Sequence, residues 1–249
     1  MTAPPRAVLT HWADELGCPP EYLGQPGTYL LRSPRVALNR FVLLRTEVSA
    51  VLQVSTVLED RAEQGALLGS GGRLAPEVLA AEQLIDRLAQ LPLSMAWTEA
   101  VFCGPGAGQV TAQQVAGVPV SLAARELRGG DARRVRDLVA AAGEREAFLS
   151  GIGGTQPPLY GSFEGDALCA VAGCEPRQSV VASVRVLTAP ARRRRGHGAA
   201  AVAATMQGAL TQGEYAVLSV AYGNRAGMRL CRRLGLDQVA VEEGMELVA

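Results

Sequence analysis

The chain has 249 residues, of which 48% are apolar, 19% charged and 4% aromatic. This length and apolar content suffice for one large domain or two ordinary ones, and they exclude a disordered or collagen-like chain. The net charge is zero and every basic residue is an arginine. The lack of lysine excludes a Schiff-base lysine and a Walker A loop.

The apolar runs fall short of the roughly 20 residues that a membrane span needs. The first six residues, Met1 to Arg6, lack the apolar region of a signal peptide. We therefore expect a cytoplasmic protein without a membrane partner. The five cysteines are widely spaced, there is no CxxC, and the chain has only two histidines. We accordingly expect neither a disulfide framework nor a metal site.

The first part of the chain is predicted to form an α+β domain. Leu9, Trp12, Ala13 and Leu16 have helical spacing. Pro76 is suited to the first turn of a second helix, whose apolar face would run to Leu88. Strands are expected at residues 28–31, 41–45, 50–54 and 97–102. The Gly-rich residues 104–117 have the composition of a linker. We therefore expect an accessory domain at 1–117 and a second domain at 118–249.

The second domain is predicted to be α/β, with a mixed sheet flanked by helices. Asp131 is a candidate N-cap, and Gly165-Asp166 is typical of a hairpin turn. The expected strands are 120–127, 159–164, 167–172, 179–187, 216–220, 238–241 and 245–248. The expected helices are one with Val135, Leu138, Val139 and Ala142 on its apolar face, and two more at 198–212 and 225–234.

Arginine is concentrated between a predicted strand and a predicted helix. Residues 176–213 contain six arginines and no acid, and four of these arginines are Arg192 to Arg195. Gly196 and Gly198 follow them and would let a ligand approach the free N–H groups of the helix's first turn. Such a loop can bind a diphosphate without a lysine or a metal.

This segment resembles the acyl-CoA-binding signature of the GCN5-related N-acetyltransferases, Arg/Gln-x-x-Gly-x-Gly/Ala, in its Arg193-x-x-Gly196-x-Gly198. A second stretch, from Leu218 through Asn224 to Leu236, resembles the fifth strand and following helix of the same family. The resemblance covers residues 118–249. It implies an acyl-CoA N-acyltransferase-like fold in which the fourth and fifth strands separate and the pantetheine arm enters between them.

The resemblance also implies acetyl-CoA as acyl donor and an amine of a small molecule or peptide as acceptor. The amine would attack the thioester directly. The strand backbone around Val186 and Thr188 would bind pantetheine, the loop would bind the diphosphate, and Asn224 would contact the cofactor arm. The implied cofactor-binding residues are Val186, Leu187, Thr188, Arg193, Arg194, Arg195, Gly196, His197, Gly198, Ala199 and Asn224.

The family's usual catalytic groups are absent at two positions. Cys231 stands where the family usually has the tyrosine that protonates the leaving thiolate, and Tyr222 is a second candidate donor. A small buried residue is the alternative interpretation of Cys231. The fourth strand offers no acid, so a base would be a water chain or an acid such as Glu126 or Glu164.

Two other functions fit the same pattern. A CoA-binding or interaction module without catalysis would explain the missing tyrosine and acid. Nucleic-acid binding by Arg192 to Arg195 is disfavoured, because aromatic residues are few and the net charge is zero. The sequence leaves the acceptor and the oligomeric state open, a homodimer included.

Overall fold

The computed structural model describes residues 1–33, 36, 40–55, 77–79, 88, 93–104, 122, 124–175 and 180–247. These residues form two compact units. The first comprises Met1–Val101, Val220–Gly223 and Gln238–Ala249, and the second comprises Phe102–Ser219 and Asn224–Asp237. The expected boundary at 117/118 lies outside the described residues. The last strand of the chain belongs with the N-terminal residues, whereas the sequence predicted it as part of the second domain.

The first unit is a mixed sheet with two helices. Its strands lie in the order β4-β1-β3-β2-β11-β5. Strand β1 pairs with β3 in parallel, and the pairs β1–β4, β2–β3 and β2–β11 are antiparallel. The elements are α1 (Arg6–Leu16), α2 (Glu21–Gly24), β1 (Gly27–Ser33), β2 (Arg40–Arg45), β3 (Ser49–Ser55), β4 (Glu77–Leu79), β5 (Leu93–Cys103) and β11 (Asp237–Leu247). The helix predicted around residues 9–16 and the four predicted strands are confirmed.

Side chains of the sheet and its turns fix the two helices. Gln53 Nε2 donates to the carbonyl of Leu16 at the end of α1, at 3.0 Å. The hydroxyls of Thr46 and Ser49 donate to the carbonyl of Leu23 in α2, at 3.1 and 3.0 Å. These bonds satisfy helix carbonyls that have no partner within the helix.

Two expectations for the first unit are wrong. The helix predicted to begin at Pro76 is replaced at Glu77–Leu79 by β4, which pairs antiparallel with β1. The rest of that segment lies outside the described residues, apart from Leu88, which is helical and packs against the core of the unit. The two predicted closing strands are one strand, β11, that runs through Gly244. A Cβ at Gly244 would overlap the ring of Trp97, so this glycine makes room for the tryptophan and does not end the strand.

The second unit is a five-stranded mixed sheet between helices. Its strands lie in the order β10-β9-β8-β7-β6; β10 and β9 are parallel and the other pairs antiparallel. The strands are β6 (Ala124–Glu126), β7 (Gln156–Glu164), β8 (Ala167–Cys174), β9 (Val181–Thr188) and β10 (Tyr215–Ala221). The helices are α5 (Ala132–Ala142), α6 (Glu144–Ser150), α7 (His197–Thr211) and α8 (Arg225–Arg233). The predicted mixed sheet is confirmed, while α6 was not predicted.

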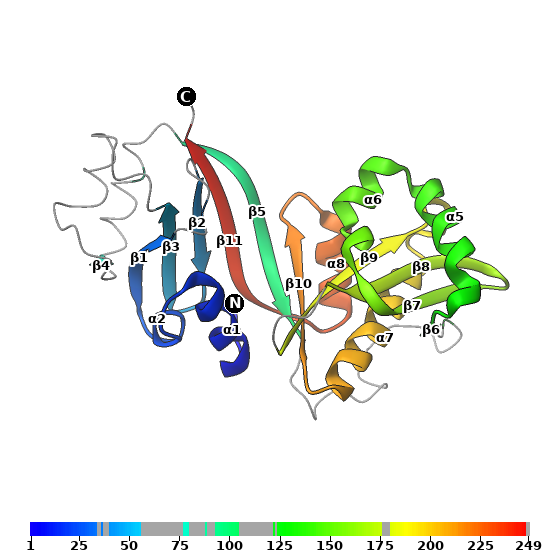
Figure 1. Cartoon of the computed structure of the whole chain (residues 1–249), viewed down its shortest axis with the longest axis horizontal. Helices are drawn as coiled ribbons and strands as arrows, with labels where there is room; N and C mark the ends of the chain where they lie inside the picture. Colours follow the sequence, from blue (N-terminus) through cyan, green and yellow to red (C-terminus); the bar gives the residue numbers. More distant parts are fainter. Residues whose placement is uncertain are drawn as a thin grey trace. The chain divides into compact units, whose positions relative to one another are not determined.

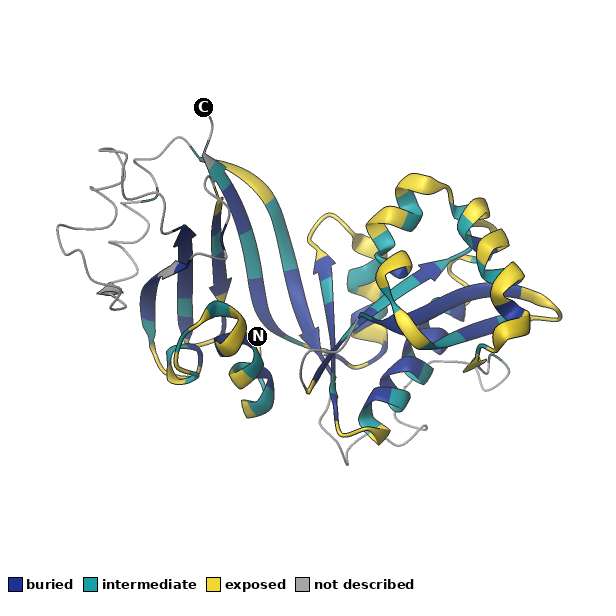
Figure 2. Cartoon of the chain, viewed as in Figure 1, coloured by how far each residue is buried: buried dark blue, intermediate teal, exposed yellow. Residues whose placement is uncertain are grey.

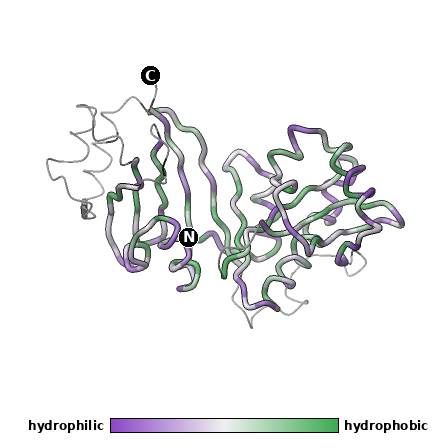
Figure 3. Tube along the Cα trace, viewed as in Figure 1, coloured by the Kyte–Doolittle hydropathy of each residue, from purple (hydrophilic) through white to green (hydrophobic). Residues whose placement is uncertain are grey.

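The helices of the second unit cover both faces of its sheet (Figure 1). Leu138 of α5 packs in a core cluster with Val171 of β8 and Leu187 of β9, as the apolar face of α5 predicted. Helix α7 contacts β7, β8 and β9, and its Gly198 lies against Val186 and Thr188. Figure 2 shows the central strands of this unit as buried and much of α5 and α6 as exposed. The hydropathy in Figure 3 follows the same division, with apolar strands and polar stretches along α5 and α6.

Within the described part of the chain, no helix combines the length and apolarity that a membrane crossing requires.

Candidate functional site

Strands β9 and β10 separate along their length. Their parallel pairing joins Val181–Ser183 to Tyr215–Val217 and ends there. Strand β9 nevertheless continues to Thr188 and β10 to Ala221. The second half of β9 therefore keeps its pairing with β8 but not with β10, which is the strand arrangement that the sequence resemblance implied.

The open edge of β9 belongs to its even-numbered residues. The carbonyl of Ser183 accepts from the N–H of Glu175 at 3.0 Å, and the N–H of Ala189 donates to the carbonyl of Cys169 at 2.9 Å. Successive residues of a strand direct their backbone groups to opposite sides, so odd-numbered residues face β8. The N–H and C=O groups of Val186 and Thr188 consequently face the gap.

Leu187 does not share this orientation, although it was among the predicted cofactor-binding residues. Its backbone faces β8 by the same alternation, and its side chain is 3% exposed in the core cluster under α5. Of the three predicted residues, Val186 and Thr188 therefore face the gap, whereas Leu187 packs in the core.

The loop after β9 brings the chain directly to a helix N-terminus. A short 3₁₀ turn, Pro190–Arg192, follows the strand, and α7 begins at His197. Arg194 and Gly196 have positive φ angles of 62° and 97°. Gly196 is the N-cap and tolerates this conformation because it has no Cβ. The N–H groups of the first turn have no acceptor within α7, so the loop presents them together with the positive end of the helix dipole.

Gly198 sits where the helix comes closest to the strand. A Cβ built at Gly198 would lie 2.8 Å from Thr188 Oγ1 and 4.0 Å from Val186 Cγ2. A larger residue would require the Thr188 side chain or the first turn of α7 to shift. The glycine therefore sets the spacing between the open strand edge and the first turn of the helix.

Three arginines of the loop are already paired with glutamates. Arg192 lies 2.7 Å and Arg195 3.6 Å from carboxylate oxygens of Glu164, at the end of β7. Arg193 pairs with Glu146 of α6. Among the described residues no ion pair involves Arg194. The loop is thus less positive in the free protein than its sequence suggests, and an anionic ligand would compete with two carboxylates.

His197 is buried beneath this loop. Its side chain is among the largest that are fully buried, and its Nδ1 lies 2.9 Å from the hydroxyl of Ser162 on β7. Burial lowers the pKa of His197, Glu164 raises it, and Arg192 and Arg195 lower it further. Burial therefore favours the neutral ring, and the contact with Ser162 holds the ring in place. Ala199, the next but one residue, is buried in the same turn.

Asn224 is the N-cap of α8. Its Oδ1 accepts from the N–H of Gly227 at 2.9 Å. This leaves the Nδ2 group as the donor that could meet a ligand at the start of α8.

The two predicted catalytic side chains lie in different units. Cys231, in α8 of the second unit, is completely buried, and burial raises the pKa of its thiol to about 12. This environment favours the packing interpretation of Cys231. Tyr222 lies in the first unit, where its exposed hydroxyl accepts from Gln238 Nε2 at 3.3 Å. The predicted bases also differ: Glu126 is exposed, whereas Glu164 is bound to the loop arginines.

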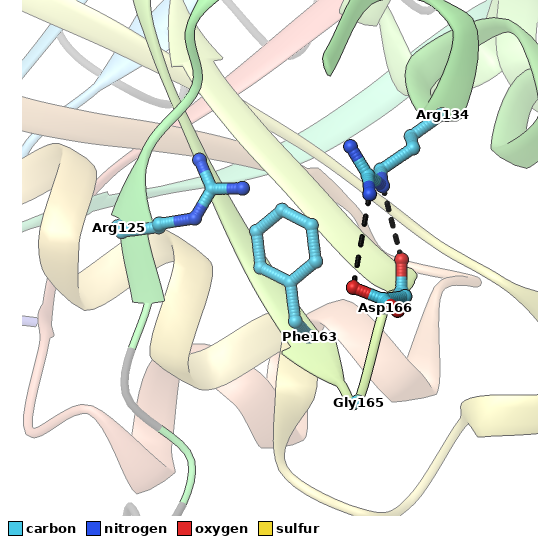
Figure 4. A pocket seen from close by; sticks show the side chains of 5 residues that line it. All are labelled: Arg125, Arg134, Phe163, Gly165 and Asp166. Carbon is cyan, nitrogen blue, oxygen red and sulfur yellow. Dashed lines mark hydrogen bonds and ion pairs between the residues drawn. The ribbon is translucent and has the colours of Figure 1, made fainter. Parts of the chain in front are cut away.

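A pocket of about 350 Å³ lies near the tip of the β7–β8 hairpin (Figure 4). It is lined by Arg125, Arg134, Phe163, Gly165 and Asp166. Arg125 lies over the Phe163 ring at 4.2 Å, and Arg134 Nε donates to the carbonyl of Asp166 at 3.0 Å.

Both arginines of this pocket form ion pairs with Asp131. Arg125 donates to both carboxylate oxygens of Asp131, at 2.7 and 2.9 Å, and Arg134 donates to one of them at 3.2 Å. Asp131 also accepts from the N–H of Arg128 at 3.0 Å. Asp131 is the N-cap residue of α5, as predicted, but its side chain makes no capping hydrogen bond to that helix and accepts from these donors instead. The pocket is therefore held by internal ion pairs and offers no free charge for a ligand.

Sequence reasoning missed the residues that surround the loop. Glu146 lies on α6, which was not predicted, and Ser162 carries no motif of its own. Both act through contacts between residues far apart in the sequence, which local patterns do not reveal.

Comparison with known proteins supports a fold and no more. No family model matches the chain, and no curated protein matches it significantly. Among solved structures, a GNAT-family acetyltransferase from Colwellia psychrerythraea matches at 13% identity and a TM-score of 0.50, over 66% of this chain and 61% of that one. A GCN5-related N-acetyltransferase from Sphaerobacter thermophilus matches at 18% and 0.50, over 66% and 56%. One from Kribbella flavida matches at 21% and 0.49, over 67% and 64%. The match spans less than two thirds of each of these relatives.

The mixed sheet, the separated parallel strands and the two similarities with a TM-score of 0.50 define one fold class. The chain has the fold of the GCN5-related N-acetyltransferases, as the two sequence motifs predicted.

Proposed function

We propose that this chain is an acetyl-CoA-dependent N-acetyltransferase acting on an amine of a small molecule or peptide. The observation that carries the proposal is the Arg193-x-x-Gly196-x-Gly198 loop, which joins the open edge of β9 to the N-terminus of α7. In CoA the pantetheine arm, which carries amide groups, is followed by an anionic diphosphate. In the chain the open strand edge is followed by the arginine loop, so the two orders match.

The backbone of Val186 and Thr188 would pair with the pantetheine arm in the manner of a strand. The diphosphate would accept hydrogen bonds from the first N–H groups of α7, which is a general property of helix N-termini. Arg193 and Arg195 would exchange Glu146 and Glu164 for phosphate oxygens, and Arg194 would add a charge that no carboxylate of the described residues offsets. Asn224 could donate from Nδ2 to the arm.

The reaction would form an N–C bond and break the C–S bond of the thioester. The attacking amine loses one proton and the departing thiolate gains one, so the products are an amide and CoA-SH. A free CoA thiol has a pKa near 8.5 and is a tolerable leaving group without a strong acid. This matters because Cys231 is buried, so we assign the proton to a water.

A CoA-binding module without catalysis is the second candidate. It is favoured by the burial of Cys231 and by the engagement of Glu164 with Arg192 and Arg195. It predicts the same binding site and no turnover.

Two measurements test the proposal and separate the candidates. The first is the affinity for acetyl-CoA of the full chain, of Gly198→Asp and of Gly153→Asp. Gly198→Asp places bulk and negative charge at the loop, and we expect affinity to fall about tenfold or more. Gly153, with no atom within 4 Å of an added Cβ, is the matched control and should bind normally. Equal affinity in all three would refute the assignment of the loop.

The second measurement is thiol release from acetyl-CoA in the presence of amino acids, polyamines, aminoglycoside-like amines and peptides. Amine-dependent release would support the transferase. Binding without release for any of these acceptors would favour the non-catalytic module.

A further inference from the structure

Three side chains with metal-ligating atoms meet beneath the arginine loop. Glu164 ends β7, Cys169 lies on β8, and His197 opens α7. One ligand atom of each lies within 4.8 Å of the others. Cys169 and His197 are buried and Glu164 is exposed, so the group is closed on one side and open on the other.

The ring of His197 has a hydrogen-bond partner at one of its two nitrogens. Its Nδ1 lies 2.9 Å from Ser162 Oγ, and Ser162 is fully buried. When the hydroxyl accepts the Nδ1 proton, Nε2 carries the free lone pair. Metal-bound histidines almost always donate their second ring nitrogen to such a partner, which fixes both tautomer and ring orientation.

From this geometry we infer that Glu164, Cys169 and His197 form a binding site for Zn²⁺ or a chemically similar divalent transition metal. A thiolate, an imidazole and a carboxylate are a donor set that zinc accepts, whereas Mg²⁺ and Ca²⁺ require oxygen ligands. Three protein ligands leave a fourth tetrahedral position on the exposed side, for water or an anion. The inference does not depend on the proposed acetyl transfer.

Binding requires two local changes. The Cys169 thiol, which donates to the carbonyl of Ala167 at 3.4 Å, would lose its proton to solvent and form the S–metal bond. Glu164 would turn from Arg192 and Arg195 toward the metal. The two arginines oppose a nearby divalent cation, so we expect an exchangeable site that is weaker than a structural zinc site with four protein ligands.

Co²⁺ is the probe, because a cobalt–thiolate bond gives a charge-transfer absorption that nitrogen and oxygen ligands do not. The full chain, stripped with a chelator and kept reduced, is titrated with Co²⁺ and then with Zn²⁺. We expect the band to saturate at one Co²⁺ per chain and to disappear when Zn²⁺ displaces it. Cys169→Ser should abolish the band.

Cys174→Ser is the control, because Cys174 is a buried cysteine on the same strand that lies outside the group. It should keep the band. Ser162→Ala should weaken Co²⁺ binding about 10- to 100-fold, as loss of an outer hydrogen bond commonly does. Circular dichroism checks that each variant is folded. If Cys169→Ser does not fold, Glu164→Gln at the exposed ligand provides a second test, and it should weaken Co²⁺ binding.

Absence of the band in the parent protein would overturn the inference. So would a band that survives in Cys169→Ser, or an affinity for Co²⁺ that is the same in Glu164→Gln and Ser162→Ala as in the parent.

Discussion

Gly198 and Thr188 approach so closely that a Cβ on the glycine would lie 2.8 Å from the threonine hydroxyl oxygen. This contact couples the first turn of α7 to the open end of β9. Gly198→Ala should therefore destabilise the second unit by about 1–3 kcal/mol, the usual cost of overpacking. Denaturant unfolding of Gly198→Ala and of the parent protein measures this loss of stability.

Thr188→Ala should relieve most of that cost, because it removes Oγ1. The two substitutions should be strongly non-additive, as is typical of residues in contact. Additive effects would mean that the clash is absorbed elsewhere and that Gly198 does not set the strand–helix spacing.

The pairing of Arg193 with Glu146 should restrain coenzyme binding. Both side chains are partly exposed, and such a pair is worth about 1 kcal/mol or less. Glu146→Gln should therefore tighten acetyl-CoA binding by up to about fivefold, and less at high salt. Glu144→Gln makes the same charge change in the same helix and should have a smaller effect. Calorimetry at two salt concentrations would show this difference, and equal effects would contradict the specific role of Glu146.

Cys231 should be dispensable for turnover. Because burial raises its pKa to about 12, its thiol stays protonated at every pH used for assay and should leave no inflection in a pH–rate profile. Cys231→Ala should lower thermal stability, by about 1 kcal/mol, and leave kcat nearly unchanged.

The family's tyrosine should not fit at the same position. Cys231 is completely buried, so Cys231→Tyr should destabilise the fold by overpacking. A hundredfold fall in kcat for Cys231→Ala, with unchanged melting temperature and CoA affinity, would instead make this residue catalytic.

Asp131 should make the second unit sensitive to acid. The hydrogen bonds from Arg125 and from the N–H of Arg128 hold its pKa far below the ordinary value. The unfolded chain takes up this proton near pH 3.9, whereas the folded protein takes it up only at lower pH. The stabilisation is therefore complete above about pH 5 and is lost as pH falls.

Asp131→Asn should accordingly lower stability at neutral pH, and the difference from the parent should shrink in acid. Asp166→Asn, at an exposed residue that Arg134 also contacts, is the control and should have little effect at either pH. A difference that is independent of pH would show that Asp131 acts by shape alone.

The sequence predicted the parts of this fold that depend on nearby residues. The β7–β8 hairpin follows from Gly165-Asp166, and the β9–loop–α7 segment follows from Pro190, Gly196 and Gly198. Once β8 is known to be the partner of β9, strand alternation also shows that the backbone of Leu187 faces β8, whereas the backbones of Val186 and Thr188 face the gap. What could not be predicted depends on distant pairs.

Three sets of distant contacts illustrate this. Trp97 packs over Gly244 within the single strand β11, where the sequence predicted two strands. Glu146 and Glu164 offset the arginines of a loop that looked purely positive. The residues of the metal-ligating group come from two strands and a helix, so counting cysteine and histidine spacings gave no sign of it.

The pairing of β2 with β11 has a consequence for folding during translation. Arg45 lies opposite Val241, so the sheet of the first unit needs a strand that the ribosome makes almost 200 residues after β2. During translation all five described strands of the second unit, β6 to β10, are made before that sheet can close. A nascent chain halted before residue 237 should bury the hydrophobic face of β2 only incompletely and should be a client for chaperones. A protease site inserted in the predicted linker, residues 104–117, would allow a single cut that places β2 and β11 in different fragments. Their pairing should hold the two fragments together until denaturant separates them.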